Sequence, residues 1–187
     1  MYSTASVNVF PEPADALYIS SPISKSIVYG GKGNDTYNVY GEFIDMFDAA
    51  GNDTYYIDEL DNEYYINDSN GKDTLIINHS KDEISLEELN VEVNAKGKIS
   101  NSKDISVRFS TEDGYIDIFE YFGKGAIERI ETADGYYITK AQMDNVAQEV
   151  AAWLTSNGFA SVEECYDKNP ANIGELAFIH ENINWQM

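Results

Sequence analysis

The sequence predicts a mainly β protein, with a short parallel β-roll, further β-strands that cap it, and C-terminal helices. Three observations predict this fold. A glycine- and aspartate-rich string recurs at residues 30–38, 51–55 and 71–75, and large apolar residues recur about every nine positions through the same region. A helical pattern appears only after residue 139. The expected divisions are a lead-in segment at 1–27, the roll at 28–78, capping strands at 79–138 and a helical region at 139–187.

The repeated string reads Gly-Gly-Lys-Gly-Asn-Asp-Thr-Tyr-Asn in its first copy, and its core returns as Gly-Asn-Asp-Thr-Tyr and Gly-Lys-Asp-Thr-Leu. The pattern is Gly-Gly-x-Gly-x-Asp-x-U-x, where U is a large apolar residue, and it is typical of calcium-binding parallel β-coils. Glycine suits positions where backbones approach closely, and turn carbonyls with a carboxylate supply the oxygen ligands that Ca²⁺ prefers. A single Gly-Asn-Asp-Thr would be an ordinary turn, but three copies in register favour the repeat.

The apolar residues of the repeat are expected to point into the space between two stacked sheets. Those at the U position are Tyr37, Met46, Tyr55, Tyr64 and Leu75. A second inward row, two residues later, reads Val39, Asp48, Ile57, Ile66 and Ile77, in which the aspartate is a break.

Successive nine-residue turns of a roll lie on opposite sides, so ions are expected between turns about 18 residues apart. One edge of the roll then holds Asp35, Asp53 and Asp73. On the other edge the aspartate position falls on Ile44 and then Asn62, and the glycines are missing. The sequence therefore predicts about two ion sites on one edge, since each ion needs several oxygen ligands, and an opposite edge closed by protein contacts.

These repeats resemble those of the RTX (repeat-in-toxin) family of type I-secreted bacterial proteins. The resemblance covers roughly residues 28–140, and segments 72–77, 84–89, 121–122 and 127–135 are similar to the capping region after such rolls. It implies a secreted protein, a type I secretion partner, an uncleaved export signal within 171–187, and Ca²⁺ as the bound ion. The residues implied as metal ligands, through backbone carbonyls or carboxylates, are Gly30, Gly31, Gly33, Asp35, Gly51, Asp53, Gly71 and Asp73.

Charge and composition agree with an acidic exported domain. The chain has 33 Asp and Glu against 12 Lys and Arg, a formal net charge of −21, which argues against binding to nucleic acid or an anionic membrane. Residues 30–78 hold eleven acidic residues and two lysines, so this segment is expected to need a divalent cation to fold. A single cysteine, Cys165, excludes an intrachain disulfide. Neither a transmembrane run nor a cleavable signal peptide is expected.

The rest of the chain carries local signals for strands and helices. Strands are expected at 89–93, 105–109 and 115–119, with turns at Asp113-Gly114 and Asp134-Gly135. Thr139 and Gln142 form a capping-box pattern, so a helix is expected from about residue 140 to 157, ending at Gly158. A short helix is expected around residues 161–166.

The sequence gives little support for an enzyme. The two histidines lack metal-type spacing, and the common nucleophile and phosphate-loop motifs are absent. A paired-carboxylate hydrolase remains open by residue type, although the acidic residues occupy turn and surface positions. Three functions remain: a secreted calcium-binding domain that folds outside the cell, a cell-surface adhesion module with a cell-surface or glycan partner that uses the 14 tyrosines, or the export domain of a toxin or hydrolase.

Overall fold

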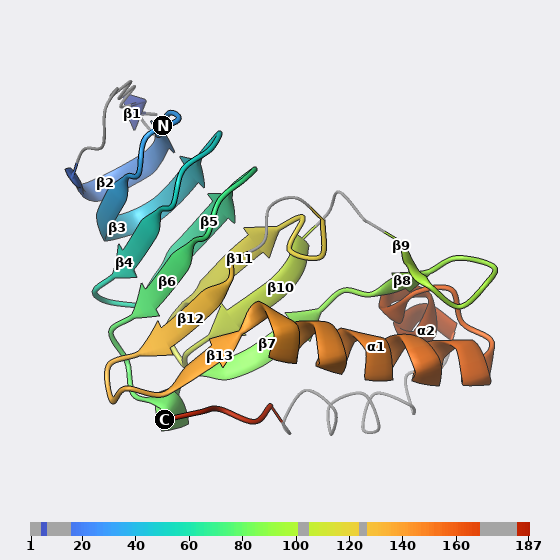
Figure 1. Cartoon of the computed structure of the whole chain (residues 1–187). Coiled ribbons are helices and arrows are strands. Elements are labelled where there is room, and N and C mark those ends of the chain that lie inside the picture. The colour runs from blue at the N-terminus through green and yellow to red at the C-terminus, as the bar shows by residue number, and fades with distance from the viewer. Residues whose placement is uncertain (1–4, 7–15, 101–104, 124–126, 169–182) are drawn as a thin grey trace.

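The computed structural model describes residues 5–6, 16–100, 105–123, 127–168 and 183–187. It is mainly β, as the sequence predicts, and two helices follow the strands (Figure 1). Nine strands form a curled sheet in the order β13-β12-β6-β4-β3-β5-β11-β10-β7, and β2 joins it beside β3.

Five parallel strands build the roll. They are β2 (Ala16–Tyr29), β3 (Thr36–Phe47), β4 (Thr54–Ile57), β5 (Glu63–Asn67) and β6 (Thr74–Ile77). The first part of β3 pairs with β4 and its second part pairs with β5, so the chain turns a corner within one strand. Gly41 lies at this corner with φ +151°, a conformation open mainly to glycine. The two sides of the roll are therefore continuous through β3.

Side chains alternate between core and surface along β4, β5 and β6, and along both parts of β3 on either side of its corner. In β3, Tyr37 and Val39 are buried while their neighbours are partly or fully exposed, which is the period-two pattern of a strand with one covered face. Tyr37 pairs in register with Tyr55, and Tyr55 with Leu75. The first two rings stack with centroids 4.7 Å apart. The predicted inward rows on this side of the roll are confirmed.

On the other side of the roll, the nine-residue step predicts that Met46 is the equivalent of Tyr64, which is two residues away from the true equivalent. Met46 is buried, as expected, but it pairs with Ile66, and Tyr64 pairs with Ile44. Ile44 is thus a core residue and not the aspartate position of the opposite edge. The reason is the corner within β3, which shortens the first half-turn from Tyr37 to seven residues and lengthens the next one to eleven.

The roll also begins earlier than the predicted boundary at residue 28. Strand β2 pairs with β3 at both its ends, from Ala16 beside Thr36 to Tyr29 beside Phe47. Residues 16–27, expected as lead-in, therefore form a turn of the roll. The short β1 (Ala5–Ser6) pairs in turn with β2.

Later strands extend both sides of the roll and cover its end, as the sequence predicts. β11 (Tyr115–Phe119) adds to β5, and β12 (Arg129–Thr132) adds to β6, both in parallel. Antiparallel neighbours complete the sheet, namely β10 (Ile105–Ser110), β7 (Ser85–Leu89) and β13 (Tyr137–Thr139). The strand expected at 89–93 is wrong: β7 ends at Leu89, a 3₁₀ turn (Lys81–Glu83) precedes it, and β8 (Glu92–Val93) pairs with β9 (Ile99–Ser100).

The C-terminal helices match the sequence prediction. α1 (Lys140–Asn157) begins after Thr139, whose hydroxyl accepts the N–H of Gln142 in a capping box, and ends at Gly158 with φ +78°. It packs against β13, β8 and β9. α2 (Val162–Lys168) buries Cys165. Among the described helices none is long and apolar enough to cross a membrane.

The tail expected to carry an export signal lies mostly outside the described residues. Within its described residues, the Trp185 ring contacts Phe109 at 6.4 Å between centroids and Gln186 pairs with Tyr137. The end of the chain is therefore part of the fold.

Candidate metal centre

Three aspartates form a column along one edge of the roll. Asp35, Asp53 and Asp73 each immediately precede a strand, and the threonines that follow them pair in register across β3, β4 and β6. The N–H of Asp35 donates to Asp53 Oδ1 at 2.7 Å, and the N–H of Asp53 donates to Asp73 Oδ1 at 2.8 Å. The predicted alignment of the three aspartates is confirmed, and the carboxylates of Asp53 and Asp73 each reach back to the preceding turn.

Two further aspartates, which sequence reasoning treated as core or left out, lie at the same edge. Asp48 follows β3 and Asp68 follows β5, both are at most 5% exposed, and each continues the inward-facing row of its strand. Asp48 interrupts the predicted apolar row because its position lies at the edge of the roll that holds the aspartates. The missed signal is the spacing Asp-x-x-Gly-x-Asp, which occurs at 48–53 and again at 68–73.

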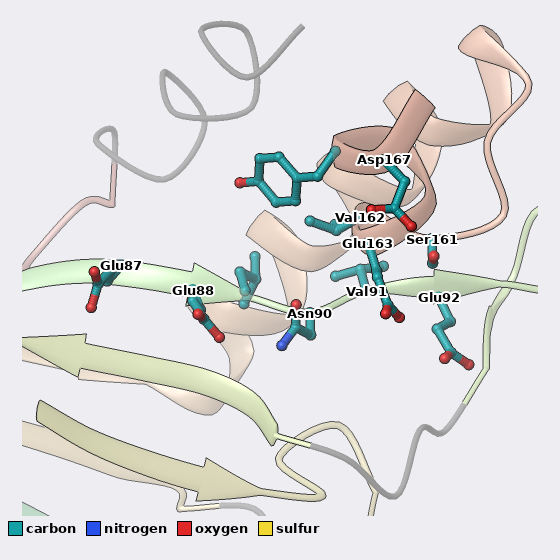
Figure 2. Close-up of a pocket in the computed structure, with 11 residues that line it drawn as sticks. Glu87, Glu88, Asn90, Val91, Glu92, Ser161, Val162, Glu163 and Asp167 are labelled. Atoms are coloured by element: carbon teal, nitrogen blue, oxygen red, sulfur yellow. The ribbon is translucent and has the colours of Figure 1, made fainter. Parts of the chain in front are cut away.

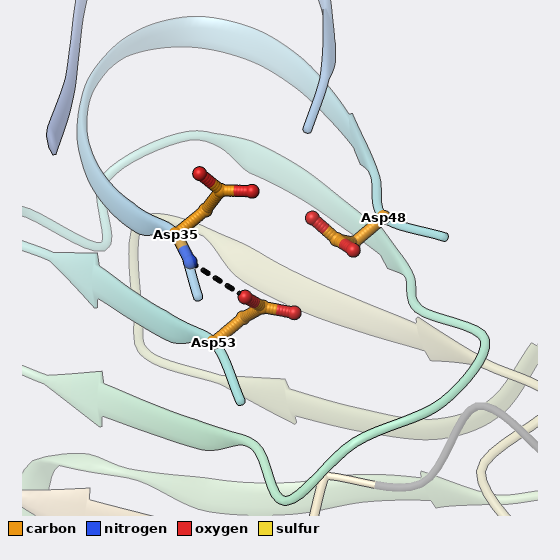
Figure 3. Close-up of side chains that lie close together, drawn as sticks. All are labelled: Asp35, Asp48 and Asp53. Carbon is orange, nitrogen blue, oxygen red and sulfur yellow. Dashed lines mark hydrogen bonds between the residues drawn. The ribbon is translucent and has the colours of Figure 1, made fainter. Parts of the chain in front are cut away.

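The five carboxylates gather into two overlapping clusters. One oxygen from each of Asp35, Asp48 and Asp53 lies within 4.8 Å of the other two (Figure 3), and the same holds for Asp53, Asp68 and Asp73. All five side chains are buried. Asp53 belongs to both clusters, so the two candidate sites share one carboxylate.

Backbone carbonyls approach the same clusters. A Cβ added at Gly51 would lie 1.8 Å from the carbonyl oxygen of Gly33 and 2.6 Å from Asp53 Oδ1. A Cβ added at Gly71 would lie 2.0 Å from the Gly51 carbonyl and 2.4 Å from Asp73 Oδ1. Each glycine is thus required by the close approach of a carbonyl and a carboxylate, and this approach brings a second kind of oxygen ligand to each cluster.

Tyrosine hydroxyls hold the two added carboxylates. Tyr37 donates to Asp48 Oδ2, and Tyr55 donates to Asp68 Oδ2 at 2.9 Å. The N–H of Ala50 also donates to Asp48 Oδ1 at 2.9 Å. The U-position tyrosines therefore do more than fill the core, because their hydroxyls fix the direction of the carboxylates at the edge.

The clusters carry more negative charge than their surroundings compensate. Burial, the largest cause, and the neighbouring carboxylates together raise the pKa of Asp48 to about 6 and that of Asp53 to about 7. Burial likewise raises the pKa of Asp73 to about 8, with contributions from Asp68 and Asp53. Burial also raises the pKa of Asp68. Carboxyl groups with such values favour either protons or a bound cation.

Two buried carboxylate oxygens have no hydrogen-bond donor among the described residues. They are Oδ2 of Asp53 and Oδ2 of Asp73, and both side chains are 1% exposed. A buried oxygen without a donor costs free energy unless a donor or a cation satisfies it. All the possible metal ligands at both clusters are oxygen atoms, which suit a hard cation such as Ca²⁺.

The remaining predicted ligands lie at the start of the column. Gly30 occupies the place in the first turn that Asp48 takes in the next, and a Cβ there would lie 2.0 Å from Asp48 Oδ2. The Gly31 carbonyl accepts the N–H of Ala50 at 3.2 Å. In the first turn this place therefore has a glycine, which leaves room for the Asp48 side chain, whereas the next turns have an aspartate there.

Glu128 ends the column at the other side. It precedes β12, in register with Asp73 before β6, and its Oε2 accepts the N–H of Asp73 at 2.8 Å. The hydrogen-bonded series of carboxylates thus runs from Asp53 through Asp73 to Glu128, which comes from the capping region. Sequence reasoning missed this residue because nothing near residue 128 repeats the glycine pattern.

The opposite edge of the roll is closed by protein contacts, as the sequence predicts. The Tyr64 hydroxyl lies 3.0 Å from the carbonyl oxygens of both Gly41 and Glu59. The Leu60 N–H donates to His79 Nε2 at 3.0 Å, and the Leu60 carbonyl accepts from the Thr111 hydroxyl at 2.6 Å. One of the two histidines is therefore occupied by a structural hydrogen bond.

A separate pocket lies between the end of β7 and α2 (Figure 2). Its volume is about 470 Å³, and its lining includes the carboxylates of Glu87, Glu88, Glu92, Glu163 and Asp167. Among the described residues, the groups of side chains close enough to share a metal ion are the two aspartate clusters of the roll and not this pocket.

The chain matches no protein-family model and no curated protein. The functional argument therefore depends on the geometry of the aspartate column.

Proposed function

We propose that the chain is a secreted calcium-binding domain whose roll folds when Ca²⁺ occupies the two aspartate clusters. The observation that carries this proposal is the pair of overlapping clusters of buried carboxylates, in which Oδ2 of Asp53 and of Asp73 has no donor among the described residues. The residues that would hold the first ion are Asp35, Asp48 and Asp53 with the Gly33 carbonyl. Those for the second are Asp53, Asp68 and Asp73 with the Gly51 carbonyl.

The mechanism follows from the electrostatics of the clusters. In the calcium-free chain, five carboxylates must come together in the protein interior, where their mutual repulsion is weakly screened. A divalent cation supplies the compensating charge, so its binding free energy is added to the free energy of folding. In a compartment with little free calcium the roll is then destabilised, and outside the cell it is stabilised.

The experiment that tests this function is a calcium titration of the chelated protein. Far-UV circular dichroism and thermal unfolding should show an increase in β-signal and in Tm on addition of Ca²⁺. Mg²⁺ should substitute poorly, because it demands a smaller octahedral arrangement of ligands. A chelated protein that already has its full sheet content and the same Tm as the calcium-loaded protein would reject the proposal.

Export by a type I channel is the second part of the proposal. It rests on the RTX-like repeats and on an acidic roll that would stay unfolded before translocation. Because Trp185 and Gln186 contact the body, deleting the whole tail would mix an effect on folding with an effect on export. Scrambling the order of residues 171–182 keeps the length and these contacts. Secretion with the matching transporter should then fall, while calcium-induced folding of the purified protein stays unchanged. Normal secretion of the scrambled protein would show that this segment is not the signal.

A further inference from the structure

One end strand of the curled sheet has an open edge within the part of the chain that the structure describes. The sheet ends at β13 on one side and at β7 on the other. The outer edge of β13 is taken, because Tyr137 and Gln186 exchange two backbone hydrogen bonds, each of 2.9 Å. Among the described strands, β7 pairs with β10 alone. The N–H and C=O groups on the outer side of β7 therefore form a template for another strand.

The open edge ends where a second segment of the chain joins. Directly after β7, residues 91–93 pair with residues 160–162 through backbone hydrogen bonds of 2.7 and 3.1 Å. Residues 85–89 have no such second neighbour among the described residues. The open stretch is thus the five residues of β7, which is the usual length of a strand.

Two hollows lie along this edge. The pocket between the end of β7 and α2, of about 470 Å³, takes its lining from residues 87–92 and from α2 (Figure 2). A smaller one of about 280 Å³ lies at the start of β7, where Ser85 and Leu86 belong to its lining together with Trp185. The side chains of an added strand would therefore find space at both ends of β7.

The charges beside the edge are negative. The lining of the larger pocket contains no lysine or arginine among the described residues, and its carboxylates are those of Glu87, Glu88, Glu92, Glu163 and Asp167. Glu88 pairs with Arg108 at 3.4 Å, and Glu92 accepts the Ser100 hydroxyl at 3.3 Å. The other three carboxylates are exposed and form no ion pair with a described residue. They are the part of the edge that a cation can approach.

Charge selects among the strands that could add to β7. A strand with lysine or arginine side chains would bring the cations that the three carboxylates lack. A second copy of the chain, paired through its own β7, would set Glu87 and Glu88 against the same residues, and the net charge of −21 on each copy adds to this repulsion. Acidic side chains on an edge strand thus exclude acidic partners and admit basic ones.

From these observations we propose that the outer edge of β7 binds an extended basic peptide segment of a partner protein as an added strand. Backbone hydrogen bonds to residues 85–89 would supply the affinity that does not depend on sequence. Lysine or arginine side chains next to Glu87 and the carboxylates of α2 would supply the specificity. The binding edge is separate from the aspartate column, which lies before and after the strands of the roll.

The test is a calorimetric titration of the full chain, in saturating Ca²⁺, with the peptide acetyl-(Thr-Lys)4-amide. Two matched peptides separate charge from backbone pairing. Acetyl-(Thr-Gln)4-amide has no cations, and a (Thr-Lys)4 peptide with N-methyl groups on two adjacent central residues lacks one N–H on each edge. The basic peptide should bind at least about tenfold more tightly than either. No binding of the basic peptide, or equal binding of its N-methylated form, would overturn the proposal.

Hydrogen exchange locates the added strand. Backbone amides of β7 should exchange more slowly when the basic peptide is bound, because an added strand forms hydrogen bonds with them. The amides of β13, the other end strand, are the internal control and should not change, since Gln186 already occupies that edge. Slower exchange in α2 without any change in β7 would place the peptide in the acidic pocket alone and would overturn the sheet-edge assignment.

Variants test the charge at the edge. Glu87→Gln and Asp167→Asn should each weaken peptide binding about two- to fivefold, the size expected of one exposed ion pair. Glu42→Gln is the matched control, because Glu42 is an exposed carboxylate on β3, which is not adjacent to β7 in the sheet. All three variants should keep the calcium response of the original chain. An equal loss for Glu42→Gln and Glu87→Gln would show that the total charge attracts the peptide and would overturn the assignment.

A last arm distinguishes a partner peptide from the chain itself as the occupant of the edge. Replacement of residues 171–182, most of a segment outside the described residues, by a glycine-serine segment of the same length should leave binding of the basic peptide unchanged. Peptide binding that appears only in this variant would show that the chain fills its own edge, and it would overturn the proposal.

Discussion

The backbone N–H of Asp35 donates to the carboxylate of Asp53, 18 residues later, at 2.7 Å. Asp53 thereby connects two turns of the roll through one oxygen, while its other oxygen is buried without a donor among the described residues. The same carboxylate belongs to both aspartate clusters. We therefore expect Asp53 to contribute more to ion binding than an aspartate that belongs to one cluster.

The first prediction is that Asp53→Asn weakens calcium binding more than Asp35→Asn or Asp73→Asn. Asp53 contributes to both clusters and the other two to one each, so its substitution should remove both binding events. Isothermal titration calorimetry on the folded variants measures the number of ions and their affinity. Asn62→Ala, on the opposite edge, is the control and should leave both unchanged. Equal losses for Asn62→Ala and Asp53→Asn would show that the ions do not lie on the aspartate edge.

A second prediction concerns the two aspartates that follow β3 and β5. Asp48→Asn should weaken the binding of one ion and Asp68→Asn that of the other, each by roughly tenfold or more, since an amide replaces a charged ligand. Without calcium, both variants should be at least as stable as the original chain, because each removes a buried charge from a repelling cluster. Chelated and calcium-loaded thermal unfolding checks both parts. A variant that loses stability in chelator but keeps both ions would show that the carboxylate is purely structural.

The third prediction is that calcium removes a pH dependence of stability that the calcium-free chain has. The carboxyl pKa values of Asp48, Asp53 and Asp73 are raised to about 6, 7 and 8, from an ordinary value near 4. A group with a raised pKa binds its proton more tightly in the folded chain. Its contribution to stability is therefore complete below about pH 4 and is lost as the pH rises through 6 to 8.

In chelator the free energy of unfolding should accordingly fall between pH 5 and pH 8.5. With saturating Ca²⁺ it should stay nearly constant over the same range, because the calcium-bound carboxylates carry no protons in the folded chain and the unfolded carboxyls have already lost theirs. Urea unfolding at both pH values in each condition measures the two slopes. Parallel slopes with and without calcium would contradict the assignment of the clusters as ion sites.

The fourth prediction is that Gly51→Ala destabilises the roll by roughly 2 kcal/mol or more. Its added methyl would lie 1.8 Å from the Gly33 carbonyl, and neither backbone can move without breaking the register of β3 with β4. Calcium affinity should fall as well, since the same carbonyl faces the first cluster. Gly123→Ala is the control, because its nearest atom, the Glu120 carbonyl oxygen, lies 3.1 Å away. A loss for Gly51→Ala no larger than that of the control would show that the close approach is not required.

Much of the local structure follows from residues close together in the sequence. The alternation of Tyr37 and Val39 with polar neighbours predicts a strand with one buried face, and the structure has it. The capping box of Thr139 and Gln142 predicts the start of α1 to the residue, because a cap is satisfied within one turn of helix. The column of Asp35, Asp53 and Asp73 follows from the spacing of the glycine repeat.

The sequence predictions are wrong where they apply the nine-residue repeat across the corner within β3. The nine-residue step places Ile44 at the edge, whereas the bend at Gly41 inside β3 places it in the core. Corner length depends on how two sheets meet, which neither strand specifies alone. The same assumption treats Asp48 as a defect in an apolar row.

By itself the sequence determined the parallel roll, its aspartate edge and the helix that follows, because repeats and caps act over short separations along the chain. The tertiary structure alone decided which carboxylates meet. It brings Asp48 and Asp68, from the ends of β3 and β5, against the aspartates that open β3, β4 and β6, and it ends the column with Glu128. Ligand clusters depend on distances across the turn and between strands far apart in sequence, and those distances exist only once the two sides of the roll have been stacked in register.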